Sequence, residues 1–291
     1  MIDVRGLRKE YGTFVAVDGL SFTVDEGEIF GIVGPNGAGK TTTLKMISTL
    51  IKPTEGRILV AGFDTGADEV EVKKRLGFLP EESPLYENMT VEDYLSFFSE
   101  LYGIESNDAH LRIDKLLSML NLPDNGNRIG NFSKGMKRKV VIARSLLNDP
   151  EVLIYDEPTS GLDPMTSKQI IDFIHGLKKE RKTVIFSAHN LYQVEKICDR
   201  LIIMKNGKAV AIGTVDEIRE RWGEQNYFVE FKSDKLPEGV VWDENGHFKI
   251  KCSGNREMND VTRFVIENRG ELIRITPHES TLEEIFISVV E

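Results

Sequence analysis

The sequence lacks three features that would place it in other classes of protein. Only two of its 291 residues are cysteine, Cys198 and Cys252, which argues against a disulfide framework and for a reducing compartment. No stretch approaches the roughly 18 uninterrupted apolar residues that a membrane-spanning helix needs. The first twenty residues carry charges throughout and have no apolar signal-peptide core. We therefore expect a soluble, cytoplasmic chain that reaches a membrane only through a partner.

An excess of positive charge is also missing. The chain has 37 Lys and Arg against 47 Asp and Glu, a formal net charge of −10. Proteins that bind nucleic acid without sequence preference are usually basic, so we expect no nucleic-acid partner. One basic cluster, formed by Lys134, Lys137, Arg138 and Lys139, could be a local nucleic-acid patch. Four cations at the start of a helix are more simply a solvated helix face.

The length allows about two domains, and the pattern indicates where they divide. Up to residue 222, short apolar β runs alternate with helical stretches, which is typical of an α/β fold with a mainly parallel sheet between helices. The expected strands are 15–17, 20–24, 28–33, 57–61, 152–155 and 183–187. Helical periodicity follows over 41–51 and again between 91 and 120.

Residues 223–291 have a different character. Alternating strands are expected at 227–232, 247–251 and 271–276, with helices over 256–268 and 280–290. Ser280 and Glu283 have the spacing of a capping box. The segment has no glycine loop and no acidic cluster of its own, and we expect it to form a small C-terminal α+β accessory domain.

The strongest motif matches G-x4-G-K-[ST] and lies between an apolar strand and an amphipathic helix. It consists of Gly34, Pro35, Asn36, Gly37, Ala38, Gly39, Lys40 and Thr41, followed by Thr42. Such a loop turns backbone N–H groups toward an anion at a helix N-terminus. Lys40 can reach the β- and γ-phosphates, and the Thr41 hydroxyl can ligate Mg²⁺. The alternative, a glycine-rich turn without a ligand, does not account for the strand and helix around it.

Two further apolar strands end in polar residues suited to phosphate chemistry. Val152–Tyr155 is followed by Asp156 and Glu157, of which the first can hold Mg²⁺ and the second can deprotonate an attacking water. Thr183–Ser187 leads to His189. In open α/β sheets, ligands bind at the carboxyl ends of strands. Taken alone, Asp156 and Glu157 are better explained as a polar turn, and His189 as a surface histidine. Beside a phosphate loop, the three residues predict one nucleotide site in which His189 senses the γ-phosphate.

Together these motifs resemble the ATP-binding subunit of an ABC transporter over residues 1 to about 220. The resemblance implies an antiparallel β subdomain, a helical insert at about 85–147, and Glu157 as general base. It implies that Tyr11 stacks on adenine and that His189 is the switch histidine. The family's signature corresponds to Ser133, Lys134, Gly135 and Met136, and its D-loop contains Ser160 and Asp163.

Three departures from the family pattern stand out. Phe132, Lys134 and Met136 replace the usual Leu, second Gly and Gln of the signature. Glu81 occupies the position of the Q-loop glutamine after Pro80, where we expect it to act as a further Mg²⁺ ligand. The tail, which includes Thr-Leu-Glu-Glu-Ile-Phe at 281–286, and the segment 85–92 are similar to ABC-2 type drug- and sodium-exporting subunits.

The resemblance implies an ATPase that uses ATP and Mg²⁺ to energise a transporter, with export as the direction. Its partners would be a separately encoded transmembrane permease subunit and a second ATPase subunit, most simply another copy. It would lie on the inner face of the cell membrane. Two alternatives stay open. A soluble ABC ATPase acting on nucleic acid or ribosomes would usually carry two cassettes or long coiled coils, and a P-loop kinase would yield a phosphorylated acceptor rather than free phosphate.

Overall fold

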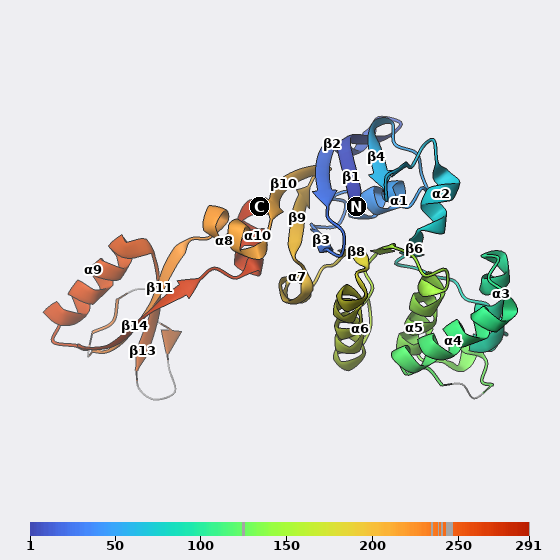
Figure 1. Cartoon of the computed structure of the whole chain (residues 1–291). Helices are drawn as coiled ribbons and strands as arrows, with labels where there is room; N and C mark the ends of the chain where they lie inside the picture. The colour runs from blue at the N-terminus through green and yellow to red at the C-terminus, as the bar shows by residue number, and fades with distance from the viewer. Residues whose placement is uncertain (124–125, 234, 238, 240, 243–246, 291) are drawn as a thin grey trace. The chain divides into compact units, whose positions relative to one another are not determined.

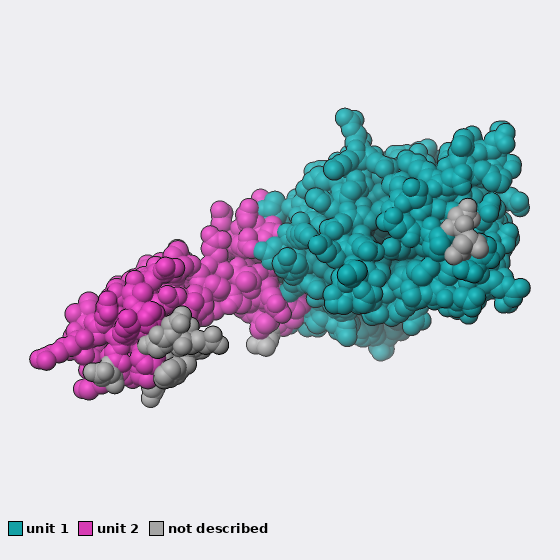
Figure 2. Space-filling model, turned by 90° about the horizontal axis from the view of Figure 1, so that it is seen from below, with its two compact units in different colours: residues 1–214 teal, residues 215–291 magenta. Residues whose placement is uncertain are grey.

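The computed structural model describes residues 1–290 apart from 124–125, 234, 238, 240 and 243–246 (Figure 1). These described residues form two compact units, Met1–Thr214 and Val215–Glu291 (Figure 2). The sequence placed the domain boundary after residue 222, which is the end of helix α8 (Val215–Trp222) and lies within the second unit. That boundary stays a prediction.

A six-stranded sheet organises the described part of the first unit, in the order β10-β9-β3-β8-β7-β6. Its strands are β3 (Ile29–Val33), β6 (Leu76–Leu79), β7 (Val152–Tyr155), β8 (Thr183–Ser187), β9 (Arg200–Lys205) and β10 (Lys208–Gly213). All neighbours pair in parallel except β10, which is antiparallel to β9. The mainly parallel α/β sheet expected from the sequence is therefore confirmed.

The central strands β3, β8 and β7 are neighbours and are buried along their whole length. Because they run in parallel, their carboxyl ends meet at one edge, where the segments after Val33, Tyr155 and Ser187 begin. The shared edge predicted from the sequence is thus present.

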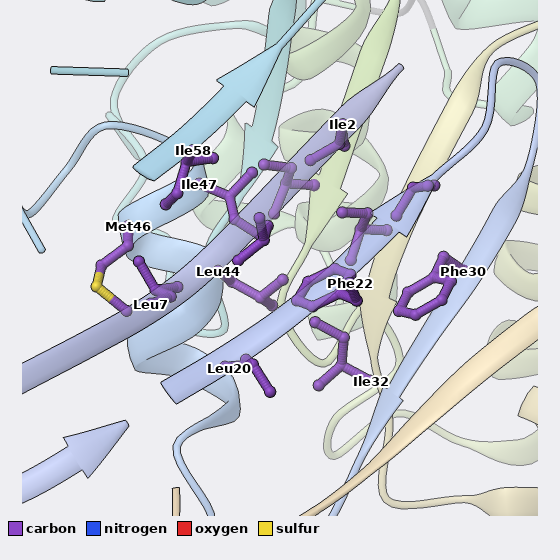
Figure 3. Close-up of a cluster of buried hydrophobic side chains, with 14 of the residues drawn as sticks. Ile2, Leu7, Leu20, Phe22, Phe30, Ile32, Leu44, Met46, Ile47 and Ile58 are labelled. Atoms are coloured by element: carbon purple, nitrogen blue, oxygen red, sulfur yellow. The ribbon is translucent and has the colours of Figure 1, made fainter. Parts of the chain in front are cut away.

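A second, antiparallel sheet has the order β2-β1-β4-β5. Its strands are β1 (Ile2–Tyr11), β2 (Phe14–Val24), β4 (Glu55–Val60) and β5 (Phe63–Asp64). Its apolar face shares one core with β3 and with helix α1 (Lys40–Ile47), as Figure 3 shows. Leu44, Met46 and Ile47 of α1 are fully buried there. This packing fixes the helix that follows the glycine loop.

The first unit contains further helices besides α1. They are α2 (Glu69–Lys74), α3 (Val91–Leu101), α4 (Ser106–Leu120), η1 (Ile129–Asn131), α5 (Lys134–Leu146), α6 (Pro164–Leu177), η2 (Lys178–Glu180) and α7 (Leu191–Ile197). Thr90 caps α3 by accepting from Asp93 N. Gly103, with a φ of 70°, lies between α3 and α4, so the helical pattern from 91 to 120 divides there.

The second unit has its own sheet and core. Its strands are β11 (Gln225–Lys232), β12 (Val241–Trp242), β13 (Phe248–Ser253) and β14 (Glu271–Glu279), in the order β12-β13-β11-β14, and its helices are α8, α9 (Gly254–Glu267) and α10 (Leu282–Val290). Val261 and Val265 of α9 pack on Val229 and Phe231 of β11. An α+β module was expected here, and the described residues form one.

Two local expectations were wrong. The first helix ends at Ile47 rather than 51, because Thr49 has a φ of 62°, which a helix cannot accommodate. The capping box is formed one residue later than expected: Glu284 N donates to Thr281 Oγ1, and Thr281 N donates to Glu284 Oε2. Ser280 instead accepts from Glu224 N.

No helix among the described residues is long and apolar enough to cross a membrane.

Candidate nucleotide-binding site

The glycine loop at 34–41 joins β3 to α1 and depends on its glycines. Gly37 and Gly39 have φ angles of 79° and 99°, in the left-handed region that favours glycine. A Cβ on Gly39 would lie 2.5 Å from Ala16 O, a clash with backbone. The loop leads directly into the N-terminus of α1, the end of a helix that attracts anions.

Lys40 is the cation of this loop and is buried. Its Nζ donates to Gly34 O at 2.7 Å and to Pro35 O at 3.3 Å. Burial lowers the pKa of Lys40, and the carboxylates of Glu157, Asp156 and Glu81 oppose that shift. Such an ammonium group, held only by carbonyl oxygens, is available to an anionic ligand.

The loop forms one wall of a cavity of about 220 Å³. Its lining comes from the tip of β2, the glycine loop, the start of α1 and the segments after β6, β7 and β8. The residues are Phe14, Ala16, Asn36, Gly37, Ala38, Gly39, Lys40, Thr41, Thr42, Glu81, Glu157 and His189. Segments far apart in the sequence thus bring the predicted phosphate loop, Glu157, Glu81 and His189 to a single cavity.

Asp156 and Glu157 follow β7 and are held by Ser187, at the end of β8. Ser187 Oγ donates to Asp156 Oδ1 at 2.6 Å and accepts from Glu157 N at 2.9 Å. Ser187 is fully buried, and sequence reasoning missed its role. The only signal was its place directly before Ala188 and His189.

Glu157 is buried, and one of its carboxylate oxygens makes no hydrogen bond within the described part of the chain. Its Oε1 is buried and accepts no hydrogen bond from any described residue, although His189 Nε2 lies 3.2 Å away. Burial raises the pKa of Glu157 to about 7; Lys40 opposes this, and Asp156 adds to it. Burial also lowers the pKa of His189, as does the charge of Lys40. A carboxylate with a pKa near neutrality beside a cavity suits proton transfer.

The basic cluster at the start of α5 was expected to be a solvated helix face, but one of its four residues is buried. Arg138 is only 8% exposed, and its guanidinium donates to backbone carbonyls of the segments that follow β6 and β7. Lys137 pairs with Glu87 at the surface, and Lys139 donates to Gln169. The difference arises because Arg138 lies on the side of α5 that faces the sheet, and helical position alone did not reveal it.

The signature residues lie at the N-terminus of α5, where they also have roles within the chain. Ser133 is the N-cap and accepts from Met136 N at 3.2 Å. A Cβ on Gly135 would lie 2.6 Å from Thr166 Cγ2, so glycine lets α5 approach α6. A Cβ on Gly161 would lie 2.1 Å from Lys134 Nζ, so glycine leaves room for this ammonium group.

The D-loop residues follow Glu157 closely. Ser160 N donates to Glu157 O at 3.1 Å. Asp163 is the N-cap of α6 and accepts from Thr166 N at 2.9 Å, with Pro164 in the first turn. The cavity lining does not include the signature or D-loop residues.

Tyr11 and Phe14 form the last pair of the β1–β2 hairpin. Tyr11 is 49% exposed, with Lys9 Nζ 5.2 Å from its ring centroid. Phe14 is 62% exposed and lines the cavity, whereas Tyr11 does not. Two exposed aromatic rings at one hairpin tip offer a stacking surface, and sequence reasoning singled out only one of them.

The oxygen donors fit a hard divalent cation that is completed by phosphates. Thr41 and Glu81 line the cavity, and Asp156 immediately precedes Glu157. Among the described residues, no group of three or more His, Cys, Asp and Glu side chains could hold a metal ion by itself.

The fold and the cavity define a P-loop ATPase of the cassette type, and comparison with known proteins identifies the family. Residues 17–160 match the ABC transporter family, and residues 213–290 match the C-terminal domain of DrrA1-3-like ATP-binding proteins. The chain is 41% identical over 227 residues to the ABC transporter ATP-binding protein NatA of Bacillus subtilis, covering 77% of this chain and 92% of NatA.

A second relative extends over almost the whole chain. The linearmycin resistance ATP-binding protein LnrL of Bacillus subtilis is 35% identical over 286 residues, covering 98% of this chain and 89% of LnrL. Among solved structures, a dimeric ATP-binding cassette in a post-hydrolysis state with ADP and Pi superimposes with a TM-score of 0.67 at 26% identity, covering 74% of this chain and 98% of the cassette.

The chain belongs to the family of ABC transporter ATP-binding proteins. It binds and hydrolyses ATP to energise an ABC transporter.

Proposed function

We propose that this chain hydrolyses MgATP with Glu157 as the general base and drives export through a separate membrane subunit. The observation that carries the proposal is the Oε1 of Glu157, which is buried, makes no hydrogen bond to any residue that the structure describes and lies at a cavity that Lys40 and His189 also line. An attacking water hydrogen-bonded to Oε1 would satisfy that oxygen. A base with a pKa of about 7 takes a proton readily near neutral pH.

The phosphates bind to the glycine loop and Lys40. Backbone N–H groups of Gly37, Gly39 and the first turn of α1 donate to the β- and γ-phosphate oxygens, and Lys40 exchanges its carbonyl partners for the same oxygens. His189 lines the same cavity and would contact the γ-phosphate there; its Nε2 lies 3.2 Å from Glu157 Oε1, close enough to respond when phosphate leaves. The adenine stacks on the hairpin tip, on Tyr11, Phe14 or both.

Thr41 and Asp156 would hold Mg²⁺, with Glu81 as a further oxygen ligand. When bound, the ion neutralises charge that builds up on the transferred phosphoryl group. Ser187 orients Asp156 for this purpose by its 2.6 Å hydrogen bond. Glu81 carries a charge where the family's pattern has a neutral amide, so it stays near a triphosphate only if a cation lies between them.

The second half of the site comes from a second copy of the chain. Ser133, Lys134, Gly135 and Met136 of one copy close over the ATP held by the glycine loop of the other, and the Ser160 and Asp163 loops meet between them. The dimeric cassette bound to ADP and Pi supports this arrangement. Closing on ATP and opening after phosphate release would supply the movement that drives the membrane subunit.

Export is the direction that the relatives favour. LnrL is named for resistance to linearmycin, and the match at 213–290 is to a domain of DrrA1-3-like proteins. The partner is a separately encoded permease, which would hold the chain at the inner face of the cell membrane. These relatives favour a transporter over the nucleic-acid or ribosome alternative.

The direct test is Glu157→Gln. The amide keeps the shape of the side chain but cannot take a proton, so hydrolysis should slow by on the order of 10²-fold or more while MgATP still binds. Phosphate release and nucleotide titration measure the two effects separately. Hydrolysis near the wild-type rate would place the base elsewhere, with Glu81 and His189 the next residues to change.

A further inference from the structure

Arg138 is the most heavily hydrogen-bonded side chain near the site, although it lies outside the cavity. A guanidinium has five N–H donors. In Arg138 all five are used, and every acceptor is a backbone carbonyl. Nε donates to Pro158 O at 3.0 Å, Nη1 to Pro80 O at 2.7 Å and Glu81 O at 2.9 Å, and Nη2 to Asp156 O at 2.9 Å and Glu157 O at 2.7 Å.

These carbonyls belong to two segments that leave neighbouring strands. Pro80 and Glu81 follow β6, and the segment 156–158 follows β7. Both segments supply carboxylates to the site. One backbone hydrogen bond, from Asp156 N to Leu79 O at 2.8 Å, continues the pairing of β6 with β7 just past the end of β7. Arg138 therefore joins the two segments through one planar group and joins both to α5.

The backbone at Glu157 needs such support. Its φ is 48°, a left-handed conformation that costs a residue with a Cβ and persists only where the surroundings fix it. Arg138 binds the carbonyls before, at and after this position, while Ser187 binds its N–H. The strained conformation aims the carboxylate at the cavity, so the group that holds the backbone also sets the position of the base.

We propose that Arg138 is a positioning residue for ATP hydrolysis: it fixes the backbone around Glu157 and connects it to the helix that begins with the signature. The inference rests on the proposed role of Glu157. Arg138 lies on α5 five residues after its N-cap, Ser133. A shift of α5 when Ser133 and Gly135 engage a nucleotide on a second copy would thus reach Glu157 and Glu81 through one side chain.

The test is Arg138→Lys, which keeps the charge but replaces the five-donor planar fork by three donors on one atom. If the substitution displaces the base by about 1 Å, kcat should fall by about 10²-fold. The Kd for MgATP should change little. Arg112→Lys is the matched control, because Arg112 also donates to a carbonyl, Leu147 O at 2.9 Å, but at the far end of α5. It should leave kcat unchanged.

A double mutant separates positioning from a general loss of structure. If Arg138 acts through Glu157, Arg138→Lys should slow single-turnover hydrolysis by less than about 3-fold in the Glu157→Gln background, because residues that act as a unit are not additive. The same factor in both backgrounds, or a raised KM with unchanged kcat, would overturn the proposal. Should Arg138→Lys not fold, Arg138→Gln, with two donors and no charge, serves in the same cycle.

The two proposals fail in different ways. Fast hydrolysis by Glu157→Gln alone would remove the proposed base and, with it, the role of Arg138. Slow hydrolysis by Glu157→Gln with a fully additive effect of Arg138→Lys would leave the base in place and contradict only the positioning role.

Discussion

The two halves of the proposed nucleotide site differ in what their residues do within a single chain. In the half built on the glycine loop, Lys40 and Glu157 are buried beside a cavity, and the Glu157 Oε1 makes no hydrogen bond with the described residues. In the half built on the signature, Ser133 and Asp163 already cap α5 and α6, and Gly135 lets those helices approach. The first half is prepared for a ligand, whereas the second half also maintains the fold.

This difference predicts opposite consequences of mutation. Residues that bind ATP add little to the stability of the nucleotide-free protein. They can even lower that stability, because a buried charge without a partner is unfavourable. Residues that cap helices stabilise the protein whether or not ATP is present. The variants below compare the two halves, beginning with the largest expected effect.

Lys40→Ala should abolish ATP hydrolysis and weaken nucleotide binding. It removes the only side-chain charge that the glycine loop directs at the β- and γ-phosphates. Phosphate release by the purified variant measures the loss. Lys45→Ala, an exposed lysine on the same helix, is the matched control and should retain full activity. Unchanged turnover in Lys40→Ala would contradict the site assignment.

Glu157→Gln should stabilise the empty protein at alkaline pH. The pKa of Glu157 is raised from 4.5 to about 7, so its contribution to stability is complete below pH 4.5 and is lost as the pH rises through 7. The neutral amide avoids this loss. The variant should therefore have a free energy of unfolding higher than that of wild type by at most about 3 kcal/mol above pH 7, and this difference should shrink as the pH falls toward 5. Urea unfolding without nucleotide at pH 8 and pH 5 measures it. A variant less stable than wild type at pH 8 would show that the carboxylate stabilises the fold.

Asp163→Ala should destabilise the protein by about 1 kcal/mol even without ATP, the usual effect of losing an N-cap. Asp163→Asn keeps an oxygen that can accept from Thr166 N and should stay close to wild type. Urea unfolding of both variants tests the comparison. Equal stability of Asp163→Ala and wild type would mean that the Asp163 cap contributes nothing to the single chain.

Glu81→Gln should have the smallest effect, a change in metal dependence rather than in nucleotide affinity. An amide oxygen is a weaker Mg²⁺ ligand than a carboxylate, so more Mg²⁺ should be needed for half-maximal hydrolysis. The neighbouring exposed Glu82→Gln is the control. Identical Mg²⁺ titrations for Glu81→Gln and wild type would exclude the carboxylate as a ligand.

The first half of the site was also the easier one to predict from the sequence. The glycine loop is a contiguous motif, and Glu157 and His189 each follow a recognisable apolar strand. A parallel sheet brings such strand ends together, so the shared edge followed from elementary geometry. The α/β fold class and the α+β character of the tail followed from the same periodicities.

Contacts between distant segments could not be predicted in this way. Arg138 looked like one of four surface cations, because a helix start rich in Lys and Arg gives no sign of which side chain turns inward. Ser187 looked like the last residue of a strand, and its bonds to Asp156 and Glu157 depend on strand order. Phe14 lines the cavity only because the β1–β2 hairpin brings its tip to the glycine loop.

The central claim is that a second copy of the chain completes the site when ATP binds. Light scattering of the Glu157→Gln variant, with and without MgATP, tests it most directly, because slow hydrolysis should trap the closed dimer. We predict a monomer without nucleotide, a dimer with MgATP, and a monomer again when Ser133→Arg blocks the signature contact. A monomer in all conditions, or a dimer that forms without ATP and survives Ser133→Arg, would contradict the account.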